Sequence, residues 1–239
     1  MIVLSATNNH YFSMTQQMLY SCNRILDSTI TTFYILDTGL TPHQVNVLTT
    51  HFKFFDIKII TYPEELCKPQ TLITYSFKCW LIDYVYKLCG EEVYMWLDAK
   101  QMLKYRQNEI EDMLERCAVW GTTLFKSEII ESVKETDWTH PTCIKRMGLT
   151  TEMVKDKKQI QSNGFIMDLR TPIGKEFFEE YKKYSFDKET IAPQGSFKHM
   201  HISIETHRQD QSVLSVLMHK YGFSDNHCLF STFHNTIFD

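Results

Sequence analysis

The stretch EVYMWLDAKQML, residues 92–103, places an acidic residue and a lysine directly after an apolar run. Residues 92–97 have the length and composition of a buried β-strand, so Asp98 is predicted to lie at the carboxyl end of that strand. Open α/β sheets bind their ligands at this edge, where an aspartate can bind a metal ion, a ribose or a phosphate-bound cation. Aspartate is also common in turns and at helix N-caps. The stretch alone leaves both interpretations of Asp98 open.

The segments before this stretch alternate between strand and helix patterns. Apolar runs of strand length occur at residues 2–7, 32–36, 56–61 and 92–97. Helical patterns lie between them: an apolar stripe over residues 13–26, a segment opened by Pro42, and residues 71–89, which Gly90 ends. This alternation predicts right-handed crossovers and a doubly wound α/β domain, with a mostly parallel sheet and helices on both faces.

The alternation loosens after Asp98. Strands are predicted at residues 117–123 and 164–169, and helices at 108–116, 172–184 and 209–222. Residues 125–160 and 183–199 show no clear period, and we expect irregular structure there. No linker, repeat or low-complexity segment divides the chain, so residues 1–239 are expected to form a single domain.

Composition and charge are those of an ordinary globular protein. Of 239 residues, 43% are hydrophobic and 23% are charged, and the net charge is −4. The chain has no Lys/Arg-rich run, which argues against nucleic acid as a partner. The chain has no run of 18 apolar residues, so no membrane span is predicted, and the amino terminus lacks the basic region of a signal peptide. Seven cysteines without a C-x-x-C pair suit a reducing compartment, so we expect a cytoplasmic location.

Several common site motifs are missing from the sequence. A dinucleotide-binding Rossmann domain needs G-x-G-x-x-G at the first strand-to-helix turn, but this turn reads SATNNHYF, residues 5–12, without a glycine. The chain also has no P-loop and no G-x-S-x-G elbow. A nucleotide would therefore have to be bound by side chains, together with a metal ion or a lysine.

Four parts of the sequence together resemble one family. They are ILDTGLT (35–41), YSFKCWLIDYV (75–85), WLDAK (96–100), and SNGFIMD (162–168) followed by HRQDQSVLSVL (207–217). In order and spacing they resemble glycosyltransferases with the GT-A-type, nucleotide-diphospho-sugar transferase fold. The likeness is greatest to a poorly characterised group with Y-x-F-K, W-L-D and H-R-x-D-Q-S segments. It implies one GT-A-type domain, with residues 1–100 as the nucleotide-binding half and residues 101–239 as the acceptor-side half.

The resemblance gives WLDAK a role and also shows a departure from the family pattern. Asp98 matches the first aspartate of the family's Asp-x-Asp motif, which faces the ribose or the metal ion. Lys100 stands where the second aspartate, the principal metal ligand, is expected. A divalent cation, Mn²⁺ or Mg²⁺, is therefore one possibility, with Asp98 and His234 as its implied ligands. The other possibility is that Lys100 supplies the positive charge directly.

The resemblance also implies the residues that contact the nucleotide sugar. Besides Asp98 and Lys100 they are Ala6, Thr7, Asn8, Asp37, Lys78, Leu97, Ala99, Asn163, Gly164 and Gln211. Other interpretations stay open for some of them. Thr7 and Asn8 are also suited to a turn that caps the next helix. Lys78 is also suited to a helix surface, with its ammonium group in water and Tyr75, Ile82 and Val85 on the buried side.

Asp210 is the implied catalytic base. It matches the acidic residue that GT-A enzymes place at a helix start beside the acceptor, where a carboxylate can accept a proton from the attacking hydroxyl group. The sequence equally allows Asp210 to be an N-cap, and the two roles are compatible.

The function expected from this resemblance is the transfer of a hexosyl or pentosyl residue. The donor would be a nucleotide-diphosphate sugar such as a UDP-sugar, and the acceptor a hydroxyl group of a glycan or a protein. Two other classes remain open. One is a catalytically inactive GT-A-type domain that binds a glycan or a protein partner, which the loss of the second aspartate favours. The other is a nucleotidyltransferase, although no glycine-rich, arginine-bearing loop follows the first strand.

Overall fold

The structure is a computed structural model of the chain. It describes residues 1–63, 74–103, 108–110, 112, 115, 122–126, 133–194, 207–222, 230–231 and 233–234. For residues 122–126, 230–231 and 233–234 it describes only the backbone. All statements below concern these residues.

The amino-terminal part alternates strands and helices as the sequence predicts. Its elements are β1 (Ile2–Thr7), α1 (Phe12–Asn23), β2 (Thr32–Asp37), α2 (Pro42–His51), β3 (Asp56–Thr61), α4 (Phe77–Cys89) and β4 (Val93–Leu97). Local signals explain where some helices begin. At α2, the N-cap Thr41 and the third helical residue Gln44 form a reciprocal capping box, and Pro42 between them occupies the first turn.

The carboxyl-terminal part holds two five-residue strands and two longer helices among shorter elements. They are β5 (Gln101–Met102), β6 (Thr122–Lys126), α6 (Glu135–Trp138), α7 (Pro141–Arg146), α8 (Thr151–Val154), β7 (Gly164–Asp168), α9 (Pro172–Phe186), α10 (Lys188–Ile191), α11 (Asp210–Lys220), β8 (Phe230–Ser231) and β9 (Phe233–His234). None of the described helices is long and apolar enough to cross a membrane.

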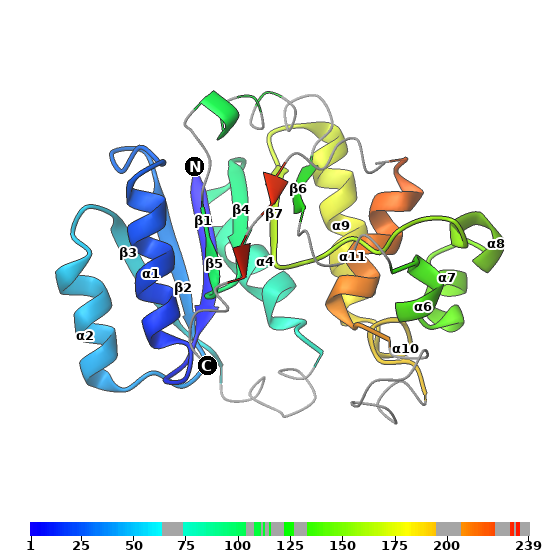
Figure 1. The fold of residues 1–239 in the computed structure, drawn as a ribbon, viewed down its shortest axis with the longest axis horizontal. Helices are drawn as coiled ribbons and strands as arrows, with labels where there is room; N and C mark the ends of the chain where they lie inside the picture. Colours follow the sequence, from blue (N-terminus) through cyan, green and yellow to red (C-terminus); the bar gives the residue numbers. More distant parts are fainter. Residues whose placement is uncertain are drawn as a thin grey trace.

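The central sheet has the strand order β3-β2-β1-β4-β7-β6-β8 (Figure 1). The first four strands run parallel, with Ile2 of β1 paired to Thr32 of β2 on one side and to Tyr94 of β4 on the other. β7 is antiparallel to both β4 and β6. The prediction of a mostly parallel α/β sheet is confirmed.

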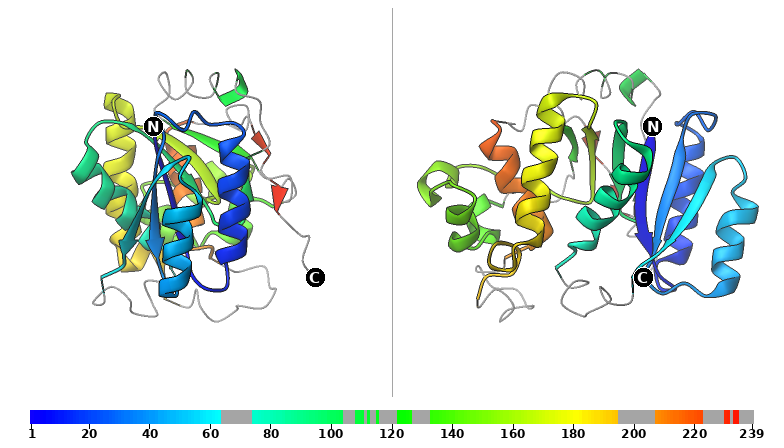
Figure 2. Two further views of the ribbon diagram at one scale, coloured as in Figure 1. Left: turned by 90° about the vertical axis from the view of Figure 1, so that its left-hand side faces the viewer. Right: turned by 180° about the vertical axis from the view of Figure 1, so that it is seen from behind.

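Helices cover both faces of this sheet, and the views in Figure 2 show α1 and α4 on opposite sides of it. Successive strand residues point to opposite faces, so the strands contribute to two apolar clusters. Val3 and Phe33 pack with Met18 of α1 on one face. Leu4 and Trp96 lie in the cluster on the other face, with residues of α4, α9 and α11.

Several boundaries differ from those expected from the sequence. The segment 125–160, expected to be irregular, contains α6, α7 and α8, and the segment 183–199 contains the end of α9 and all of α10. These pieces are too short to show a helical period in the sequence. The strand expected at 117–123 is β6 at Thr122–Lys126, and residues 117–121 lie outside the described part. The helix expected over 108–116 is described only at residues 108–110, 112 and 115, which are helical.

Candidate functional site

A cavity of about 530 Å³ lies where β1 and β4 end. Five stretches of chain line it: residues within 6–11, 75–78, 96–100, 161–163 and 208–211, together with Thr38 and Trp138. The carboxyl ends of parallel strands in open α/β sheets commonly hold ligands, and this volume lies in the range of small-molecule sites. Ten of the residues predicted from the sequence lie in its wall: Ala6, Thr7, Asn8, Lys78, Asp98, Ala99, Lys100, Asn163, Asp210 and Gln211.

Four predicted residues are placed differently. Asp37 lies outside the cavity lining, and its Oδ1 accepts hydrogen bonds from the amides of Gly39 (2.8 Å) and Leu40 (2.7 Å) in the turn after β2. Leu97 is buried in the core and pairs with Gly164 at the start of β7, and neither lines the cavity. The backbone of His234 pairs with Gln101 in the strand pair β5–β9, but its side chain is outside the described part.

Lys78 is the centre of a buried charge cluster in the cavity wall. Its ammonium nitrogen lies 3.1 Å from Asp98 Oδ1, 3.0 Å from Asp210 Oδ2 and 3.0 Å from the carbonyl oxygen of Ser162. Only 4% of the Lys78 side chain is exposed, so the interpretation as a surface lysine is wrong. Burial by itself lowers the pKa of a lysine, but the two carboxylates outweigh it and raise the pKa of Lys78 to about 12.

Asp98 does not cap a helix or a turn with its side chain. Its Oδ1 accepts hydrogen bonds from the indole Nε1 of Trp96 (2.7 Å) and from Lys78. Its backbone amide donates to the carbonyl oxygen of Asn163 (2.9 Å), which joins the end of β4 to the segment before β7. The Asp98 side chain is 26% exposed, and it is the more accessible of the two acids in the cluster. Asp98 therefore presents a fixed carboxylate to the cavity.

Asp210 is the first residue of α11, and it is not the N-cap. The N-cap is Gln209, which makes no side-chain capping bond. The Asp210 carboxylate accepts instead from Lys78 and from the hydroxyl group of Ser162 (2.7 Å). Burial raises the pKa of Asp210, and Lys78 and Ser162 oppose this rise only in part. A carboxylate of raised pKa at a helix N-terminus in a cavity wall is suited to accept a proton.

Asn8 and Thr7 combine a structural role with their place in the cavity wall. Asn8 Oδ1 accepts hydrogen bonds from the amides of His10 (2.9 Å) and Tyr11 (3.1 Å), which form the turn that leads into α1. Thr7 Oγ1 accepts from the hydroxyl group of Thr15 (2.7 Å). Asn8 therefore forms a turn before α1, but the N-cap of α1 is Tyr11, which makes no side-chain capping bond, and both Thr7 and Asn8 line the cavity.

Two cavity residues have backbone conformations that only glycine adopts at low cost. Among the described residues other than glycine, positive φ values occur at Tyr75 (58°) and Gln209 (44°), and both line the cavity. Tyr75 is 47% exposed, so the expectation that it marks the buried side of its helix is wrong. Strained residues of this kind cluster at functional sites, where the surrounding structure enforces them.

Arg208, Gln161, Ser162 and Trp138 line the cavity but were not predicted from the sequence. The guanidinium carbon of Arg208 lies 4.0 Å from the centre of the Trp138 ring, a cation–π contact. The carbonyl oxygen of Trp138 accepts from the Arg208 amide (3.1 Å) and from the hydroxyl group of Ser212 (2.8 Å). These bonds join α6 to the start of α11.

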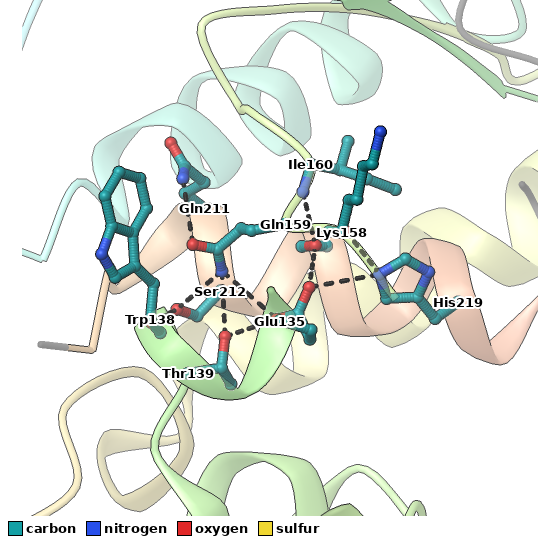
Figure 3. A network of polar contacts seen from close by, with 10 residues as sticks. Glu135, Trp138, Thr139, Lys158, Gln159, Ile160, Gln211, Ser212 and His219 are labelled. Atoms are coloured by element: carbon teal, nitrogen blue, oxygen red, sulfur yellow. Dashed lines mark hydrogen bonds and ion pairs between the residues drawn. The ribbon is translucent and has the colours of Figure 1, made fainter. Parts of the chain in front are cut away.

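A buried polar network supports this wall from behind (Figure 3). Glu135 is fully buried and accepts hydrogen bonds from the hydroxyl groups of Thr139 and Ser215 and from the amide of Gln159 (3.2 Å). The Gln159 amide oxygen accepts in turn from Gln211 (3.3 Å), which lines the cavity. The network therefore fixes α6, the segment before β7 and the start of α11 relative to one another.

The described residues do not fit the divalent cation that the family resemblance implies. A divalent cation of this kind takes several oxygen ligands at short distance. Within the described ranges, no three His, Cys, Asp or Glu side chains are grouped to hold a metal ion. Asp98 Oδ1 already contacts the ammonium group of Lys78, and the next position of the motif is Lys100.

No protein-family model matches the chain, and no curated protein matches it. Solved structures, however, share its fold. The galactosyltransferase LgtC with donor and acceptor sugar analogs aligns over 91% of this chain and 70% of its own, with a TM-score of 0.52 and 13% identity. Mouse xyloside xylosyltransferase 1 aligns over 93% and 82%, with a TM-score of 0.52 and 10% identity. The glycosyltransferase GlyE of Streptococcus pneumoniae TIGR4 aligns over 96% and 44%, with a TM-score of 0.51 and 12% identity. At these identities the likeness concerns the fold, and the chain has the GT-A-type glycosyltransferase fold.

Proposed function

We propose that this protein is a glycosyltransferase that moves a hexosyl or pentosyl residue from a nucleotide-diphosphate sugar to a hydroxyl group of a glycan or protein. The observation that carries the proposal is the buried cluster of Asp98, Lys78 and Asp210 in the wall of the 530 Å³ cavity. The fold shared with three solved glycosyltransferases supports it. The cysteines that the structure describes, Cys22, Cys79, Cys89 and Cys143, are free thiols, which supports a reducing, cytoplasmic location.

In this proposal Asp210 is the general base. The acceptor hydroxyl oxygen attacks the anomeric carbon while the bond from that carbon to the diphosphate breaks, and the diphosphate leaves with the electron pair. The hydroxyl proton moves to the Asp210 carboxylate, and the anomeric centre is inverted. Burial raises the pKa of Asp210, which makes it a stronger base than an exposed aspartate. Asp98 would hold the ribose or sugar hydroxyl groups at the end of β4.

A panel of nucleotides and nucleotide sugars tests the proposal by thermal unfolding. A ligand at a hundred times its Kd stabilises the folded state by about 2.7 kcal/mol. For a protein of this size, that corresponds to a rise in Tm of roughly 5 °C or more. We expect such a rise with the donor, and formation of a glycoside when acceptor is added. No rise with any member of the panel would refute the proposal.

The second candidate is a GT-A-type domain that binds a glycan or protein partner without catalysis. Lys100 favours it, because this lysine replaces the family's principal metal ligand. The same panel separates the two candidates. A nucleotide sugar that raises Tm but is never consumed, with any acceptor, would support the non-catalytic domain.

Lys100 gives a separate prediction. If it supplies the positive charge near the departing diphosphate, wild-type activity should persist in a chelator, and Lys100→Ala should lose about tenfold or more of its activity. Rising salt should weaken donor binding, because Lys100 is only half-buried. The lysine has no such role if wild-type activity disappears in the chelator and Lys100→Ala keeps nearly the full wild-type activity without it.

A further inference from the structure

Lys78 has no proton left for a ligand. An ammonium group donates three hydrogen bonds. In this structure Asp98 Oδ1, Asp210 Oδ2 and the Ser162 carbonyl oxygen lie at 3.1, 3.0 and 3.0 Å from its nitrogen, and Ser162 Oγ lies at 3.3 Å, so protein acceptors account for all three protons. Lys78 therefore orients the two carboxylates, and a bound anion would have to find its positive charge elsewhere in the cavity.

The other cations of the cavity wall are Arg208 and Lys100. Neither forms an ion pair with an acidic side chain among the residues that the structure describes. His207, next to Arg208, adds no charge at neutral pH, because burial lowers its pKa to about 4. The acids of the cavity are thus held by Lys78, while Arg208 and Lys100 have no acidic partner within the described part of the chain and can face an anion.

Arg208 is held in place before any ligand is bound. Its guanidinium group lies on the Trp138 ring, 4.0 Å from the centroid. Its amide donates to the carbonyl oxygen of Trp138 (3.1 Å) and to the hydroxyl oxygen of Ser212 (2.9 Å). The following residue, Gln209, is in the left-handed region of φ, which turns the chain into α11. Arg208 is nevertheless exposed, so its hydrogen-bond donors can reach a ligand.

We infer that Arg208, supported by Trp138, binds the diphosphate of the donor together with Lys100. The inference rests on the proposed function. A planar guanidinium group can bind phosphate oxygens with two parallel hydrogen bonds, and stacking on an aromatic ring fixes its plane. Two side-chain cations would then offset the charge that develops on the diphosphate as it leaves. Trp138 is a positioning residue in this arrangement.

Isothermal titration with inorganic pyrophosphate, and separately with UDP, tests the inference in a buffer that contains a chelator. Wild type should bind pyrophosphate, and Arg208→Ala should bind it about 10- to 100-fold more weakly, as expected for the loss of a charge-assisted hydrogen bond. Arg208→Lys should recover only part of the affinity, because a lysine keeps the charge but loses the planar fork. Trp138→Leu should weaken binding less than Arg208→Ala, since the guanidinium group remains.

Arg24→Ala is the matched control, because Arg24 is an exposed arginine at the end of α1 that does not line the cavity. It removes the same charge and should bind pyrophosphate as wild type does. Far-UV circular dichroism and Tm check that each variant is folded, and Arg208 is exposed enough for Arg208→Ala to keep its stability.

The outcomes separate this inference from the proposed function. Equal pyrophosphate affinity in wild type and Arg208→Ala overturns the inference, even if sugar transfer is observed. The absence of pyrophosphate and UDP binding to wild type also overturns it. If affinity falls in Arg208→Ala and not in Arg24→Ala, the diphosphate site is supported. It stands even if no nucleotide sugar is ever turned over, in which case the proposed transfer fails alone.

Discussion

Replacing Lys78 with methionine should lower the free energy of unfolding by about 3–5 kcal/mol, the cost of removing one partner from a buried ion cluster. The substitution keeps an unbranched side chain only one heavy atom shorter, but leaves Asp98 and Asp210 without their shared cation. Burial already raises the pKa of Asp210, and the loss of Lys78 raises it further. The deficit should therefore be largest at neutral pH, and should shrink as the pH falls through that pKa and the carboxyl group is protonated. Urea unfolding at several pH values measures both effects.

Lys87→Met is the control on the same helix, because Lys87 is 70% exposed and pairs with Asp83 at the surface. It should change stability by less than about 1 kcal/mol. The double variant Lys78→Met with Asp210→Asn should regain part of the loss, since it removes one of the two uncompensated charges. If Lys78→Met is as stable as Lys87→Met at neutral pH, the buried cluster is not formed in solution.

Asp210→Asn should lower the rate of glycosyl transfer by about a hundredfold or more while changing stability little. Asparagine has the same shape, its carbonyl oxygen can still accept from Ser162 and Lys78, and Lys78 keeps its pair with Asp98. What disappears is the proton acceptor. In wild type, activity should fall at acid pH as Asp210 is protonated, and because its pKa is raised this fall should begin above the range of an ordinary aspartate. The residual activity of the variant should lack this acid limb.

Asp56→Asn serves as the comparison, since Asp56 is exposed at the start of β3 and outside the cavity lining. Its rate and pH profile should match those of wild type. An Asp210→Asn protein that loses several degrees of Tm but keeps its turnover would assign Asp210 to structure alone.

Much of the fold follows from the sequence because the signals are local. Alternating apolar runs and helical stripes predict the strands β1 to β4, and parallel strands bring their carboxyl ends to one edge. The sequence alone therefore predicts that Thr7 and Asp98 lie at the same edge of the sheet, and both line the cavity. The short helices α6 to α8 were missed, because four to six residues cannot show a helical period.

The environment of the charged residues was harder to predict, since it depends on contacts between distant parts of the chain. A lysine in an amphipathic helix is ordinarily a surface residue, but Lys78 is buried and donates a hydrogen bond to Ser162, which lies 84 positions later in the sequence. Asp210 looked like an N-cap, and only its contact with Lys78 shows otherwise. Arg208 lies 70 positions after Trp138, yet its amide donates a hydrogen bond to the Trp138 carbonyl oxygen and its guanidinium group stacks on the Trp138 ring. No local sequence pattern predicts these contacts.

The satisfied ammonium group of Lys78 also bears on how fast the site can respond to a donor. Its acceptors are all protein atoms, so both carboxylates are already oriented before a donor binds, and that of Asp210, whose side chain is 5% exposed, is also largely desolvated. An incoming donor therefore does not have to strip water from Asp210 or fix a flexible lysine, both of which would cost affinity and time on binding. The groups of this cluster are therefore arranged during folding, and that cost does not recur when the donor binds.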